Sequence, residues 1–111
     1  MESFRMHLGN LDQIRLGEGR SFSIGFHEVA VFRSIDGRLF AVESRCPQGG
    51  CLAAGVLKEN IIECPTHGHK FNLYTGLGLV SQECVRTFKV WEENGNIMLL
   101  FAFPAISNSL T

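Results

Sequence analysis

Apolar residues recur at every second position in several short stretches of this chain. Phe22, Ile24 and Phe26 alternate with small or polar residues, and the same period runs through residues 4–8. A period of two is the pattern of a half-buried β-strand. No window of helical length keeps an apolar spacing of three to four residues, and twelve glycines interrupt any candidate helix. The sequence therefore predicts an all-β fold, a small antiparallel barrel or sandwich.

Two β-hairpins are predicted where a turn-forming pair separates two apolar, β-branched runs. Asp36-Gly37 lies in one turn and Asn94-Gly95 in the other. Such pairs supply the positive backbone angles that a tight hairpin turn needs. The strands predicted from these patterns are 4–8, 21–26, 28–34, 38–43, 60–63, 70–73, 85–91 and 96–101.

The length and composition predict one folded domain. A chain of 111 residues has no room for two independent cores, and its 45% hydrophobic and 19% charged residues are typical of globular proteins. We expect the domain to span residues 1–104 and the small, polar stretch 105–111 to be a poorly ordered tail. The net charge of -1 provides no basic excess, so we expect neither nucleic acid nor an anionic membrane as the main partner.

The N-terminal stretch has no continuous apolar run of the kind found in secretory signals, and the apolar run 97–104 is too short to span a bilayer. We therefore expect a cytoplasmic protein. In a reducing compartment, four cysteines favour free thiols, metal ligands or redox groups over two structural disulfides.

Two of the four cysteines lie in similar loops. Cys46 and Cys64 are each followed by proline, in glycine-containing segments that separate predicted strands. His67 follows Cys64 after two residues, a spacing that lets thiolate and imidazole face one centre, and Cys51 could contribute from the first loop. This pattern predicts a Cys/His metal site at one end of the fold. Cys84 has no neighbouring ligand, and we expect it to be a buried packing residue.

At these two loops the sequence resembles the Rieske iron–sulfur family, whose pattern is Cys-x-His in one loop and Cys-x-x-His in the second. The resemblance extends to the family's strands and turns over nearly the whole chain. Within the family, Thr75-Gly76 and residues 83–90 are most similar to the small subunit of assimilatory NAD(P)H-nitrite reductase. Free-standing Rieske-type ferredoxins of ring-hydroxylating dioxygenases share the fold and the loops.

The resemblance implies a [2Fe-2S] cluster with Cys46 and Cys64 on one iron and His67 on the other. Where the family has its first histidine, this chain has Gln48, and a glutamine amide is a weak donor to iron in a sulfide cluster. Three outcomes are open. Cys51 replaces the missing ligand, Gln48 or water completes a labile cluster, or the cluster is absent. In membrane-complex relatives a cysteine in the position of Cys51 forms a disulfide with the second loop, but Thr66 stands at the matching position here.

The resemblance also implies one-electron transfer with a redox partner protein, which would be a flavin or iron–sulfur reductase or the large subunit of an oxidoreductase. No active site of its own is expected in this chain. Two alternatives stay open: a cluster-free subunit that docks onto a reductase, and a structural zinc site built from Cys46, Cys51, Cys64 and His67.

Overall fold

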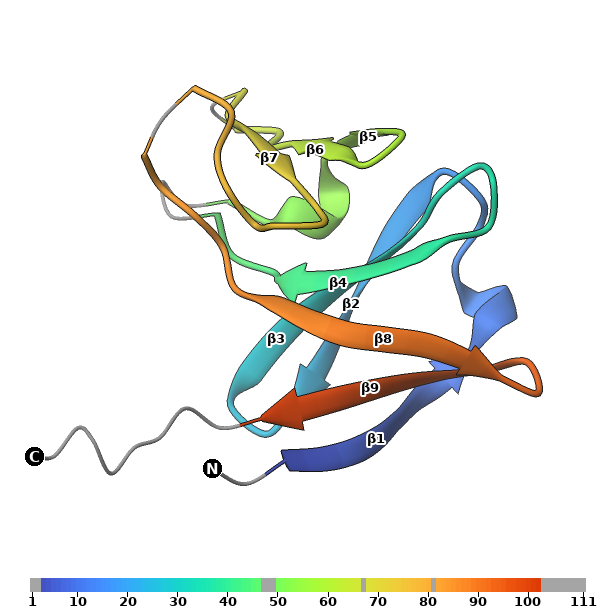
Figure 1. Ribbon diagram of the computed structural model, residues 1–111. Helices are drawn as coiled ribbons and strands as arrows, with labels where there is room; N and C mark the ends of the chain where they lie inside the picture. Colours follow the sequence, from blue (N-terminus) through green and yellow to red (C-terminus); the bar gives the residue numbers. More distant parts are fainter. Residues whose placement is uncertain (1–2, 47–49, 67, 81, 103–111) are drawn as a thin grey trace, which may run out of the picture.

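The structure is a computed structural model that describes residues 3–46, 50–66, 68–80 and 82–102 (Figure 1). Within these residues the chain forms nine β-strands and two short 3-10 helices, with no α-helix, which confirms the all-β prediction. None of the described helices is long and apolar enough to cross a membrane. The elements are β1 (Ser3–Asn10), η1 (Leu11–Gln13), β2 (Glu18–Ile24), β3 (His27–Arg33), β4 (Leu39–Glu43), η2 (Leu52–Ala54), β5 (Val56–Lys58), β6 (Ile61–Glu63), β7 (Lys70–Asn72), β8 (Thr87–Glu93) and β9 (Asn96–Ala102).

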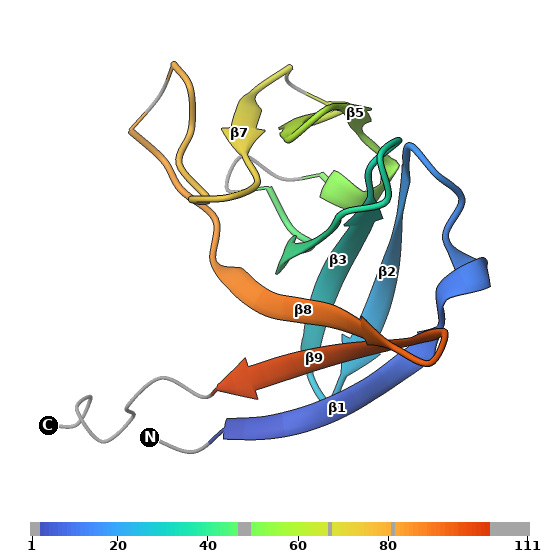
Figure 2. The same cartoon turned by 45° about the vertical axis from the view of Figure 1, so that its right-hand side comes forward.

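The strands form two antiparallel sheets of unequal size. The large sheet has six strands in the order β1-β9-β8-β4-β3-β2, and the small sheet has three in the order β5-β6-β7. The large sheet curls into a half-barrel, and the small sheet lies over one end of it, as Figures 1 and 2 show from two directions. The first cysteine loop lies in the segment that connects the large sheet to the small one, and the second joins β6 to β7 within the small sheet, so both loops lie at the end covered by the small sheet.

Strand β3 is buried on both faces and separates two hydrophobic cores. Val29 and Val31 point into the core enclosed by the large sheet, whereas Ala30 and Phe32 point toward the small sheet. This arrangement explains why the run from Val29 to Phe32 is apolar without interruption. The core between the sheets contains Ala30, Phe32, Phe40, Val42, Cys46, Leu52, Ile62, Cys64, Phe71, Leu73 and Val85.

Both predicted hairpins are present, and their turns differ. Asn94 and Gly95 have φ angles of 50° and 81° and join β8 to β9 as a two-residue turn. In the hairpin of β3 and β4, only Gly37 has a positive φ, of 88°. The backbone N–H of Ser34 donates to the carbonyl of Arg38 at 2.8 Å, so three residues form this loop. Asp36 therefore does not take the left-handed conformation expected of it; its carboxylate accepts a hydrogen bond from Arg38 instead.

The observed strands differ from the prediction in two places that have local reasons. The predicted strand 21–26 is observed as Glu18–Ile24, because Gly25, with φ of 62°, begins the turn to β3. Strand β5 was not predicted, since its three residues are too few to display a period. The proposed tail 105–111 and the domain boundary at 104 lie outside the described residues.

Strand β1 lies at one edge of the large sheet and β2 at the other. The pairing of β1 with β9 shifts register between His7 and Gly9, which is a β-bulge near the end of β1. His7 Nε2 and Asn96 Oδ1 lie 3.1 Å apart on the two paired strands.

Candidate metal centre

The first cysteine loop, residues 44–51, follows β4 and closes on itself at its base. The backbone N–H of Cys46 donates to the carbonyl of Gly50 at 3.1 Å, and Arg45 pairs with Cys51 in an antiparallel bridge. Cys46 is fully buried, with none of its surface exposed. The loop therefore begins as a narrow hairpin whose first cysteine points into the protein. Gln48 lies in the segment 47–49, outside the described residues.

The second loop, residues 64–69, joins β6 to β7 and is similarly closed. The backbone N–H of Cys64 donates to the carbonyl of His69 at 2.7 Å, and the N–H of Gly68 donates to the carbonyl of Cys64 at 3.0 Å. Gly68 has a φ of 72°, which a residue with a side chain rarely adopts. Cys64 is 1% exposed. His67 lies outside the described residues.

The two loops meet at Gly50. A Cβ atom on this residue would lie 2.7 Å from Thr66 Oγ1 and 3.3 Å from Cys64 Sγ. Cys46 and Cys64 also belong to the same cluster of buried side chains, and neither forms a disulfide. The fold thus brings two buried thiols together from loops that are far apart in sequence. Two thiolates in an apolar, water-poor environment are suitable ligands for an iron of a sulfide cluster, so this half of the site fits the expected group.

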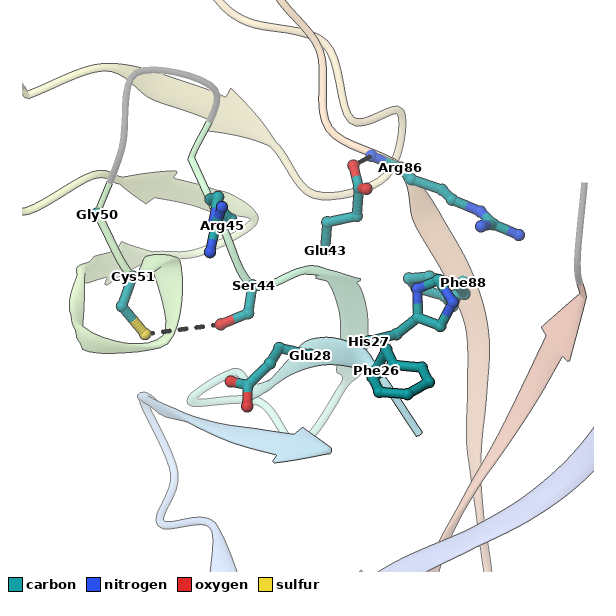
Figure 3. A pocket seen from close by; sticks show the side chains of 10 residues that line it. All are labelled: Phe26, His27, Glu28, Glu43, Ser44, Arg45, Gly50, Cys51, Arg86 and Phe88. Carbon is teal, nitrogen blue, oxygen red and sulfur yellow. Dashed lines mark hydrogen bonds between the residues drawn. The ribbon is translucent and has the colours of Figure 1, made fainter. Parts of the chain in front are cut away.

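Cys51 has a different environment, which Figure 3 shows. Its Sγ lies 3.6 Å from Ser44 Oγ, the contact drawn as a dashed line in Figure 3. It also lies 3.7 Å from Ser21 Oγ, and the two hydroxyl oxygens are 2.9 Å apart. The thiol is exposed on the wall of an open cavity of about 660 Å³, which Phe26, Arg45 and Arg86 also line. The hydroxyl of Ser44 contributes most to lowering the pKa of Cys51, because it donates a hydrogen bond to the thiolate; Ser21 and the backbone of residues 53–54 act in the same direction.

The described residues contain no group of three or more His, Cys, Asp or Glu side chains placed to hold a metal ion. Cys46, Cys51 and Cys64 are all described, so they do not form such a group among themselves. Sequence reasoning did not single out Ser21 or Ser44, because Ser21 is 30 residues away from Cys51 and meets it only through the pairing of strands.

Cys84 is exposed, so the prediction that it is a buried packing residue is wrong. It lies in the segment between β7 and β8, where Leu77 and Cys84 form an isolated antiparallel bridge. The next residue, Val85, is 4% exposed and points into the core. Alternation along an extended chain places neighbouring side chains on opposite sides, and Cys84 takes the outer side.

Comparison with known proteins identifies relatives over most of the chain. The sequence profile of the Rieske-like [2Fe-2S] domain matches residues 6–100. The ferredoxin subunit of 3-phenylpropionate/cinnamic acid dioxygenase from Photorhabdus laumondii is 37% identical over 76 residues, which cover 65% of this chain and 71% of that protein. The ferredoxin component of naphthalene 1,2-dioxygenase/salicylate 5-hydroxylase systems from Ralstonia is 29% identical over 92 residues, covering 80% of this chain and 88% of the relative.

Solved structures have the same fold. The ferredoxin of carbazole 1,9a-dioxygenase from Nocardioides aromaticivorans superposes with a TM-score of 0.77 at 28% identity, covering 86% of this chain and 95% of that one. A putative NADH-dependent nitrite reductase small subunit from Mycobacterium tuberculosis superposes with a TM-score of 0.84 at 19% identity, covering 94% and 100%. The second likeness concerns the fold alone.

Proposed function

Because this chain belongs to the family of Rieske-like [2Fe-2S] domains, we propose that it is a one-electron carrier, a ferredoxin component of a larger oxidoreductase system. The observation that carries the proposal is the pair of buried thiols, Cys46 and Cys64, on two loops that meet at Gly50. A single buried cysteine is common in protein cores, but two buried thiols on loops that meet suit a sulfide cluster, which needs protection from water and oxygen.

Cys46 and Cys64 are the proposed thiolate ligands, and His67 is the proposed imidazole ligand. A bound [2Fe-2S] cluster would supply one reversible electron. The chain's own residues would exclude water from the thiolates through the packing of Leu52 and Phe71, which are fully buried in the same core. The absence of a side chain at Gly50 would leave space beside Cys64 Sγ.

We propose that the fourth ligand position limits how firmly the site retains the cluster. Gln48 stands where the resemblance places a histidine, and an amide oxygen binds iron less well than imidazole does. We therefore expect the cluster to be lost in air, and Gln48→His to slow that loss. The measurement is the decay of visible absorbance under air for the two proteins. Equal decay rates would contradict a role for this position in cluster retention.

The same relatives support the proposal that a partner protein exchanges electrons with this chain. One solved neighbour, 28% identical with a TM-score of 0.75, is from a complex of reduced oxygenase and oxidized ferredoxin in carbazole 1,9a-dioxygenase. We propose that a flavin or iron–sulfur reductase supplies the electron and that an oxygenase or another large oxidoreductase subunit accepts it. Identities of 28–37% to dioxygenase ferredoxins favour this role over that of a nitrite reductase small subunit, whose solved examples are 19–23% identical.

The test is anaerobic purification followed by analysis of iron, acid-labile sulfide and zinc, with a visible spectrum. We expect roughly two irons and two sulfides per chain. Cys46→Ser should abolish the colour, and Cys84→Ser should not, because Cys84 is exposed on the segment between β7 and β8. A folded, colourless protein without metal would contradict the proposal and support a docking subunit. One zinc per chain without sulfide would support the zinc site.

A further inference from the structure

The base of the first loop alternates between two faces. Cys46 pairs with Gly50 through a backbone hydrogen bond, and the neighbouring pair is Arg45 with Cys51. In an antiparallel ladder, paired residues point to the same face and adjacent pairs point to opposite faces. The face of Cys46 and Gly50 is directed at the core and at Cys64 Sγ. The face of Arg45 and Cys51 is directed outward, and both residues line the open cavity drawn in Figure 3.

The thiol of Cys51 is already engaged on that outward face. It forms a triangle of contacts with Ser21 and Ser44, whose three edges are 3.7, 3.6 and 2.9 Å long. Ser44 is 4% exposed, so its hydroxyl is removed from competing water. Ser21 belongs to β2, the edge strand of the large sheet, and Ser44 directly follows β4. The triangle therefore connects the end of the first loop to the large sheet.

The backbone around this triangle is fixed by further hydrogen bonds. The N–H of Ser44 donates to the carbonyl of Glu28 at 3.0 Å, and the N–H of Leu52 donates to the carbonyl of Ser44 at 2.7 Å. Leu52, which begins η2, is fully buried. Both ends of the loop are thus held against the large sheet, and the side chains of Ser44 and Cys51, one at each end, both contact Ser21 of β2.

From this geometry we infer that Cys51 is a positioning residue of the first loop and not a cluster ligand. The inference rests on the proposed function, because it decides which residues of the site contact iron. To reach the face of Cys46 and Cys64, the Cys51 side chain would have to break its contacts with both serines and reverse the alternation at the base of the loop. Its role is to hold the loop so that Cys46 stays at its place.

The test compares Cys51→Ser, Cys51→Ala and Cys46→Ser in the reconstituted holoprotein. Serine retains the hydrogen bonds to Ser21 and Ser44 but is a poor ligand for iron in a sulfide cluster. We expect Cys51→Ser to have the visible spectrum, the electron paramagnetic resonance g-values and the reduction potential of the parent. Cys51→Ala should share these signatures and lose its cluster on warming roughly fivefold faster, the factor that corresponds to about 1 kcal/mol.

Ser21→Ala is the matched control, since it removes the same contact from the other side and should behave as Cys51→Ala does. Altered g-values or a shifted potential in Cys51→Ser would overturn the inference, as would a loss of colour equal to that of Cys46→Ser. If the parent chain itself binds no iron, the proposed function fails. The positioning role is then tested in the metal-free protein, where Cys51→Ala must lower the thermal midpoint and Cys51→Ser must restore it; equal midpoints would overturn it.

Discussion

Gly50 occupies a position between the two cysteine loops where a larger residue does not fit. Its φ of 108° is unfavourable for any residue with a side chain, and a Cβ would come within 2.7 Å of Thr66 Oγ1. Gly37 has a similar φ of 88°, but a Cβ atom on Gly37 would meet nothing within 4 Å. Alanine at position 37 would therefore introduce backbone strain alone, whereas alanine at position 50 would introduce both strain and a clash between the two loops.

We predict that Gly50→Ala destabilises the fold by roughly 1–3 kcal/mol and also lowers the iron content, because the added methyl group pushes the second loop away. Gly37→Ala should lower the thermal midpoint through strain alone and retain iron. Thermal unfolding and iron analysis of both variants check this. An equal loss of iron in Gly37→Ala would show that stability, and not contact between the loops, controls iron retention.

The lowered pKa of Cys51 has a measurable consequence. The hydroxyl of Ser44 stabilises the thiolate, so the thiol ionises at a lower pH than an ordinary cysteine. In a Cys84→Ser background, we predict that alkylation of folded protein by iodoacetamide begins at a lower pH than for an ordinary cysteine thiol. Ser44→Ala should move the profile to higher pH. If alkylation of the parent and of Ser44→Ala depended on pH in the same way, the Ser44 hydroxyl would not be the cause of the lowered pKa of Cys51.

At the scale of elements, local signals predicted strands and hairpins well where turn chemistry and period agree. Residues 28–34 and 38–43 correspond to β3 and β4, because Gly37 fixes the turn between two apolar runs. The surroundings of Cys51 and Cys84 were not predictable. Cys51 meets Ser21 only after β2 and β4 have been placed in one sheet, and the exposure of Cys84 depends on which side of the segment faces the core.

Substitution of two buried phenylalanines, one in each core, tests whether packing between the sheets keeps the cysteine loops in place. Phe71 of β7 packs in the cluster that contains Cys46 and Cys64, whereas Phe101 of β9 packs in the other core. Both are buried, so we predict that Phe71→Leu and Phe101→Leu each destabilise the protein by roughly 1–3 kcal/mol. Only Phe71→Leu should lower the iron content of the folded fraction. The measurement is the iron content of each variant after size-exclusion chromatography. An equal loss of iron in both variants would show that the two cores do not have separate roles in retaining iron.

At the scale of the whole molecule, the two cores respond differently to a ligand. The core enclosed by the large sheet contains Val31, Leu99 and Phe101 and includes no cysteine among the described residues, so its packing does not depend on metal. The core between the sheets contains both buried thiols. Binding of a cluster to the native state therefore stabilises chiefly the small sheet and its loops.

We predict that removal of the cluster leaves slow amide hydrogen exchange in β8 and β9 unchanged and accelerates exchange in β6 and β7. The reason is that local opening follows the loss of local contacts. Hydrogen exchange with mass spectrometry on holo and metal-free protein measures both regions in one experiment. Uniform acceleration across the two sheets would mean that the molecule unfolds as a single cooperative unit.

The β-bulge near the end of β1 affects whether two molecules of this protein can associate through the edges of their sheets. A straight, exposed edge strand invites another chain to add to the sheet and form lasting aggregates. The register shift between His7 and Gly9 marks a bulge in β1, and a bulge bends its strand and so hinders the continuous addition of a second strand. A carrier must leave each partner after a brief encounter, and an interrupted edge favours short-lived contacts over permanent stacking.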